Sequence, residues 1–239
     1  MKRSGTRSKI PILLIATVLG STLIALAGPP LTCHALFIGD AKSLPWASSA
    51  GSQIGNEGYN LQHLADDTLA LLTDEMPVIV RMETLRRATL YSQKDSNVAK
   101  ELLGKLRARA FGSAAKGRPD ALALFDLGYF VECTKQANMT WKKLSTGTYD
   151  PVYQANVASG LDGLAWVEKA IEMRGKDAEM EFAAALITSY PKQKSYDEHL
   201  RRAVEGASEG TLLARNLVEH FSDKGKTLAE LHASLRGGN

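Results

Sequence analysis

Histidine side chains are the first candidates for chemistry in this sequence, because they bind metals and transfer protons near neutral pH. Four of them follow residue 34: His63, His199, His220 and His232. None has a glutamate three positions before it, and no two are four residues apart. The Glu-x-x-His pattern of di-iron bundles and the His-x-x-x-His pattern of helical zinc proteases are therefore missing. The sequence predicts no metal site and no cofactor.

Signals for nucleophilic catalysis are equally weak. Ser-x-x-Lys occurs at 113–116 and 189–192, but the Ser-Asp-Asn and Lys-Thr-Gly motifs that accompany it in penicillin-recognising enzymes are absent. Phosphate-binding glycine loops and the Gly-x-Ser-x-Gly elbow are also missing. Glu168 and Glu172 share a helical face and are interpreted as surface charge. These patterns favour a protein that is not an enzyme. The alternative is a small-molecule-binding protein or an unrecognised hydrolase, with a pocket near residues 141–172 that recruits one of these glutamates.

Aromatic residues are concentrated between positions 125 and 166, which hold seven of the sixteen in the chain. Trp141, Tyr149 and Tyr153 surround a break in the helical pattern that contains Gly147 and Pro151. Aromatic side chains with a polar group favour interfaces and ligand pockets, because one end is apolar and the other forms hydrogen bonds. We therefore predict that these three form a recognition loop for a ligand or partner. Three others are expected in the core: Phe125, Phe130 and Trp166.

The N-terminal 35 residues have the layout of a secretory signal. Four basic residues without an acid precede an uncharged apolar run, Ile10–Ala27, which ends before two prolines. Small residues at the last and third-last positions allow two cuts, after Ala27 or after Ala35. Ala35 is the expected site, because Pro29 and Pro30 keep the chain extended a few residues upstream. The rest of the protein is then periplasmic or secreted. The alternative is an uncleaved single membrane anchor with the domain outside.

Removing this segment changes the charge of the protein. The whole chain carries 29 basic and 26 acidic residues, but four of the basic ones precede Ala35, which leaves 25 against 26. The mature chain is thus close to neutral and has no basic patch for nucleic acid. Its expected partner is another envelope or secreted protein, and its only membrane contact would be an uncleaved N-terminal segment. Cys133 would be the one thiol left, and its apolar surroundings predict a buried, inert side chain.

The remaining sequence predicts helices. Residues 36–58, rich in glycine and serine toward their end, are expected to form a flexible lead-in, and 59–239 a single all-α domain. The apolar run after Asp120 predicts a central helix. In the helix after Pro77, Arg81, Glu83, Arg86 and Arg87 are expected on the solvent side. Apolar periodicity and capping residues place helices at about 61–72, 77–91, 95–111, 120–137, 153–174, 177–189, 195–207, 211–221 and 227–235.

No segment alternates apolar and polar residues in the manner of a strand. We therefore expect about eight helices in antiparallel hairpins, as a helical bundle or a short α-solenoid. The stretch 124–131 resembles the first helix of a tetratricopeptide repeat, with Leu127 and Gly128 in the Leu-Gly positions. A second copy at the 34-residue period does not follow, so the sequence assigns no family.

Overall fold

The computed structural model describes residues 30–46, 55–115, 117–144, 157–190 and 192–236, and these residues confirm the all-α expectation. Their only extended pairing is one isolated bridge between Ser189 and Lys192. The helices are α1 (Pro30–Cys33), a 3₁₀ turn η1 (Leu61–His63), α2 (Leu64–Leu71), α3 (Val78–Ser92), α4 (Ser96–Ala115), α5 (Ala121–Leu144), α6 (Gly163–Arg174), α7 (Ala178–Thr188), α8 (Tyr196–Glu205), α9 (Leu212–His220) and α10 (Leu228–Arg236).

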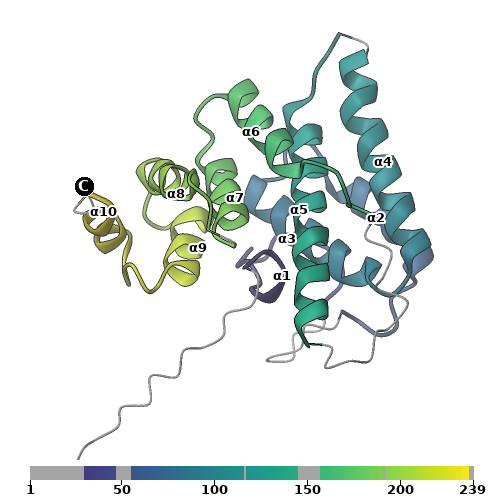
Figure 1. Cartoon of the computed structure of the whole chain (residues 1–239), viewed down its shortest axis with the longest axis horizontal. Coiled ribbons are helices and arrows are strands. Elements are labelled where there is room, and N and C mark those ends of the chain that lie inside the picture. Colours follow the sequence, from purple (N-terminus) through teal and green to yellow (C-terminus); the bar gives the residue numbers. More distant parts are fainter. Residues whose placement is uncertain (1–29, 47–54, 116, 145–156, 191, 237–239) are drawn as a thin grey trace, which may run out of the picture.

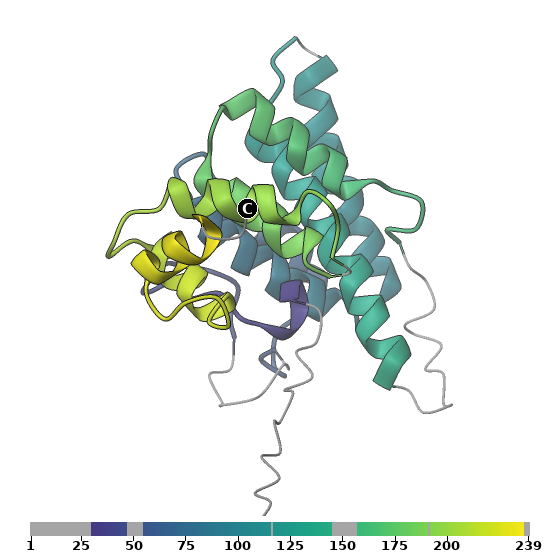
Figure 2. The same ribbon diagram turned by 60° about the vertical axis from the view of Figure 1, so that its left-hand side comes forward.

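Helix α5 runs through the middle of a bundle-like arrangement, as its apolar sequence predicts (Figure 1). It packs against α3 and α4 on one side and against α6 on another, and it also contacts α1 and α7. Helices α7 and α8 pack against each other, and α9 and α10 complete that end of the molecule (Figure 2). No helix among the described residues has both the length and the apolar character needed to cross a membrane. The apolar run Ile10–Ala27 lies outside the described residues.

The crossing of α5 and α6 depends on two glycines. A Cβ atom built on Gly128 would lie 2.6 Å from the carbonyl oxygen of Gly163, and one built on Gly163 would lie 2.5 Å from that of Gly128. Any side chain at either position would force the two backbones apart. Helix α6 begins at this contact, after Asp162, whose carboxylate caps the Ala165 N–H. The expected start near Tyr153 is therefore wrong, because residues 157–160 form turns before this cap.

We predict that Gly128→Ala lowers the free energy of unfolding by about 1–3 kcal/mol, because the added methyl overpacks the crossing. The matched control is Gly104→Ala in α4, where a Cβ meets no atom within 4 Å. That change should raise stability by about 0.5–1 kcal/mol, because alanine is the better helix former. Urea unfolding followed by circular dichroism measures both. Equal effects of the two substitutions would contradict the close approach of α5 and α6.

Residues 30–46, here called the N-terminal arm, are packed into the molecule. Leu36, Ile38 and Leu44 are buried members of the hydrophobic core, and Trp46 packs against it. The expectation of a flexible lead-in over 36–58 is therefore wrong for 36–46. Glycine- and serine-rich composition dominates only after Trp46, whereas the arm itself carries apolar side chains that the helices bury.

The charged residues of α3 require a further correction, because Arg81, Glu83 and Arg86 are buried rather than solvated. Arg81 Nη1 donates to Asp126 Oδ2 of α5 at 2.7 Å, and neither side chain is exposed. The same guanidinium donates to the backbone oxygens of Thr73 and Met76. Burial raises the pKa of Asp126 to about 7, against the opposing effect of the nearby arginines. Because Arg81 and Asp126 come from different helices and carry opposite charges, each compensates for the cost of burying the other.

Glu83 lies at the centre of a second buried network. Its two oxygens accept from Arg86 Nε at 2.8 Å and from Arg87 Nε at 2.7 Å, and Leu36 N–H donates to it at 3.0 Å. Arg86 Nη1 reaches on to the Thr32 carbonyl at 3.0 Å. The charged face of α3 thus binds the backbone of the N-terminal arm. Sequence periodicity alone suggests that this face is solvated, but the arm occupies the place of the water.

His220, at the end of α9, holds the arm from the other side. Its ring lies 5.8 Å from that of His34, and it hydrogen-bonds the backbone of Ala35. Burial, helped by the positive charges of His34 and Arg86, lowers the pKa of His220 to about 4. The unfolded chain therefore binds a proton that the folded chain rejects between pH 6.5 and about 4.

We predict that His220 alone destabilises the fold by on the order of 2–3 kcal/mol as the pH drops through this window, whereas protonation of Asp126, whose pKa is raised to about 7, acts in the opposite direction. His220→Gln keeps a neutral donor near Ala35 and should remove the contribution of His220 from the pH dependence. The solvent-exposed His63→Gln serves as the control and should leave it unchanged. Urea unfolding of wild type and of each variant at pH 4.5 and at pH 7 gives the change in the free energy of unfolding between the two pH values, which is then compared among the three proteins. An unaltered slope in His220→Gln would show that the imidazole is not held neutral.

Candidate functional site

The sequence-predicted recognition loop lies largely outside the described residues. Tyr149 and Tyr153 belong to the part that the structure does not describe, and only the backbone of Trp141 is described. That backbone is helical, because α5 continues to Leu144 instead of ending near residue 137. Trp141 is therefore on a helix rather than in a loop. The role of the three aromatics as a binding surface stays a prediction.

The other aromatics of this region are placed as expected. Phe125 and Phe130 are fully buried, and Trp166 is partly buried with its ring edge-on to Phe111 at 5.8 Å. Cys133 is fully buried, and burial raises the pKa of its thiol well above the usual value, so it stays protonated. None of these residues offers a reactive group to solvent.

A polar cleft lined by charged groups lies between α6, α7 and α8, and we call it the α6–α8 cleft. It has a volume of about 630 Å³. Seven of its ten lining residues are charged, and Ile171 is the only large apolar one. The lining consists of Ile171, Glu172, Gly175, Lys176, Glu181, Glu198, Arg201, Arg202, Glu205 and Gly206.

The inner wall of the cleft is built on a buried carboxylate. Glu181 of α7 is almost fully buried, and its Oε2 lies 2.6 Å from His199 Nδ1 of α8. A proton at Nδ1 donates to this carboxylate, which leaves Nε2 facing Glu168 of α6 at 3.6 Å. Arg202 Nη1 approaches the second oxygen of Glu181 at 3.4 Å. One buried carboxylate thus binds two side chains of the neighbouring helix.

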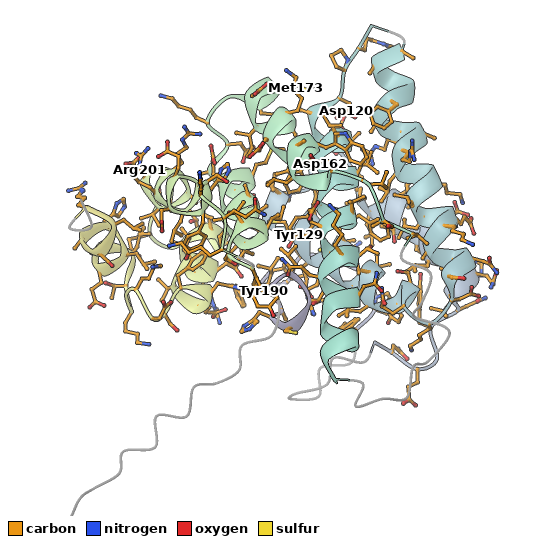
Figure 3. The ribbon with its side chains drawn as sticks, in the orientation of Figure 1. Asp120, Tyr129, Asp162, Met173, Tyr190 and Arg201 are labelled. Atoms are coloured by element: carbon orange, nitrogen blue, oxygen red, sulfur yellow. The ribbon has the colours of Figure 1, made fainter. Side chains whose placement is uncertain are left out.

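The rim of the cleft consists of exposed ion pairs along α8. Glu198 accepts from Arg201 and from Arg202 at 2.7 Å each, and these hydrogen bonds hold the pKa of Glu198 below its usual value. Arg201 also reaches Glu205 at 2.7 Å. In Figure 3, Arg201 lies on the outer side of α8, far from Tyr129 in the middle of α5. Exposed pairs of this kind are weak, so a charged ligand can exchange partners with them.

Lys176 differs from the arginines of the cleft. It follows Gly175 in the turn between α6 and α7, and both residues have positive φ angles. Within the described part of the chain, no carboxylate lies within ion-pair distance of its amine. It is therefore the cation of this cleft most available to a ligand.

The lining of the cleft consists mainly of carboxylates and cations. No serine, threonine, cysteine or tyrosine is among its lining residues, so it offers no hydroxyl or thiol nucleophile. No group of three metal-ligating side chains exists among the described residues. Glu172, which the sequence singled out, is one of the lining carboxylates, and Glu168 contacts His199 beside the cleft.

Sequence reasoning missed Glu181, His199 and Arg202. The available signal was Glu181 itself, because it is the one charged residue in the run Met180–Ile187 and all the remaining residues of that run are apolar. A charge on a helix that is apolar all round must find a buried partner. The partner is 18 positions away on the next helix, and the spacing gives no hint of it.

Comparison with protein-family models, with curated proteins and with solved structures finds no match to this chain.

We predict that Glu181→Gln lowers the free energy of unfolding by about 1–3 kcal/mol, because His199 and Arg202 lose their buried anion. The matched control is Glu205→Gln, at an exposed pair on the rim of the same cleft, which should change stability by less than about 0.5 kcal/mol. Urea unfolding at neutral pH compares the two variants. A Glu181→Gln effect no larger than that of Glu205→Gln would remove Glu181 as the organising residue.

Proposed function

We propose that this protein is an exported, non-enzymatic helical protein that binds another protein of the cell envelope or exterior. The α6–α8 cleft carries the proposal of a binding role, because its walls present carboxylates and cations side by side, with no hydroxyl or thiol nucleophile among the lining residues. A polypeptide segment with both acidic and basic side chains complements such a surface. Its basic groups would pair with Glu172 and Glu205, and its acidic groups with Lys176.

The polarity of the cleft supports a protein partner over a drug-like apolar ligand. Pockets for such ligands are lined mainly by apolar and aromatic side chains, whereas Ile171 is the one large apolar residue here. Electrostatic complementarity between partners gives specificity and speeds association, and it weakens as salt is added. The proposed interaction should therefore be salt-sensitive and charge-specific.

The volume of the cleft favours a second candidate, a small molecule that carries both charges. About 630 Å³ lies within the usual range of small-molecule sites. An amino acid or dipeptide would satisfy the same carboxylates and the same lysine. The test below distinguishes this candidate from a protein partner.

The test uses the partner captured by cross-linking in the source cells, purified and titrated against the protein by calorimetry. Lys176→Glu should weaken binding about tenfold, which corresponds to about 1.4 kcal/mol. The matched control is Arg215→Glu on α9, a residue that is paired with Glu219 outside the cleft and should leave affinity unchanged. Raising the salt from 50 to 300 mM should also weaken binding by wild type.

Two results would contradict the protein-partner proposal. One is equal affinity of the partner for wild type and Lys176→Glu. The other is a rise in the melting temperature on addition of free amino acids or dipeptides, which disappears in Lys176→Glu. The second result would establish the small-molecule candidate instead.

A further inference from the structure

The first residues of the N-terminal arm bear on where an export signal can be removed. Helix α1 contributes Leu31 and Thr32 to the interior, where each is nearly inaccessible. Leu31 N–H donates to Gln136 Oε1 of α5 at 3.0 Å, and this hydrogen bond is buried. The Thr32 carbonyl accepts from Arg86 at 3.0 Å, also in the interior. Residues 30–35 are therefore part of the folded domain.

A cut after Ala35 would remove residues 30–35 and their contacts from the fold. The buried guanidinium of Arg86 would lose the Thr32 carbonyl, and Gln136 would lose its donor from Leu31. Each lost hydrogen bond of a buried polar group is unfavourable, and the gap left by the Leu31 side chain adds to the loss. His220 would lose its contacts with His34 and Ala35 as well.

The new terminal amine of Leu36 would not compensate for these losses. Its nitrogen lies 3.0 Å from Glu83, so after a cut it would bring a positive charge there. Glu83 already carries Arg86 and Arg87, at 2.8 and 2.7 Å. A third cation at one buried carboxylate adds repulsion and requires desolvation of a further charge.

We propose that the export signal is removed after Ala27, so that the mature protein begins at Gly28 and keeps residues 30–35 as part of its core. This inference rests on the proposed export of the protein. Ala25 and Ala27 supply the small residues that signal peptidase requires, directly after the apolar run. A signal of 27 residues lies within the usual range of 15–30, whereas one of 35 exceeds it. Cys33 is then retained, and the mature chain carries two thiols.

The first test expresses the full chain in an exporting host and determines the N-terminus and the intact mass of the recovered protein. We expect Gly28 as the first residue and two thiols after reduction and unfolding. Ala27→Leu should accumulate the uncut precursor, because the bulky side chain blocks the peptidase. The matched control Ala35→Leu, at a solvent-exposed position, should be processed as wild type. A start at Leu36, with one thiol and a block by Ala35→Leu, would overturn the proposal.

A second variant tests retention independently of peptidase recognition. Leu31→Ala should lower the urea midpoint of the recovered exported protein, because it empties a buried position. An unchanged midpoint would contradict retention, since residue 31 is absent from a protein cut after Ala35. A retained Met1 in wild-type protein that has crossed the membrane would overturn the cleavage and make the N-terminal segment an anchor, whereas a retained Met1 in protein that stays inside the cell would overturn the proposed export. In both cases a loss of stability in Leu31→Ala would still show that residue 31 belongs to the core, so the failures are distinguishable.

Discussion

The buried carboxylate of Glu83 is the interaction on which the architecture depends. It gathers two arginines of its own helix and a backbone N–H from the N-terminal arm, 47 residues earlier in the chain. A charge in the interior needs hydrogen-bonding partners, and here four N–H groups from three residues donate to the two oxygens. Because Arg86 extends this network to the Thr32 carbonyl, the arm is fixed at two points. The position of the arm in turn determines what the later helices can contact.

The arm joins the two ends of the molecule. Asn216 of α9 exchanges two hydrogen bonds of 2.8 Å with the backbone of Phe37, and the guanidinium of Arg215 lies over the Phe37 ring. On the other side, Arg87 and Tyr91 of α3 bind the backbone of Leu44 and Pro45. The arm thus behaves as an extra element of the core, and beyond the short helix α1 it has no regular structure of its own. Its backbone polar groups are satisfied by side chains rather than by a neighbouring strand.

Several helix positions could be predicted from the sequence because they depend on local information. Asp177 caps α7 with its side chain, and Thr211 caps α9 in the same way, close to where the sequence places these helices. The start of α6 was misplaced, because its cap, Asp162, was not recognised. Burial of Arg81 and Glu83 could not be predicted, because their spacing is the same as that of a solvated face. The groups that cover them come from Asp126 and from the arm, which are distant in sequence. Of the candidate site, only Glu172 was anticipated, since the contact of Glu181 with His199 forms between two helices.

The hydrogen bonds between Phe37 and Asn216 span 179 residues, and this separation has a consequence for how the chain folds. Contacts so distant in sequence close a very large loop, which slows folding relative to a chain of local helical hairpins. The arm is synthesised first, yet α9 is among the last elements to appear. During synthesis or translocation, the arm therefore lacks its contacts with α9 until nearly the whole domain has emerged. This contact of the arm can form only after the C-terminal helices have been made.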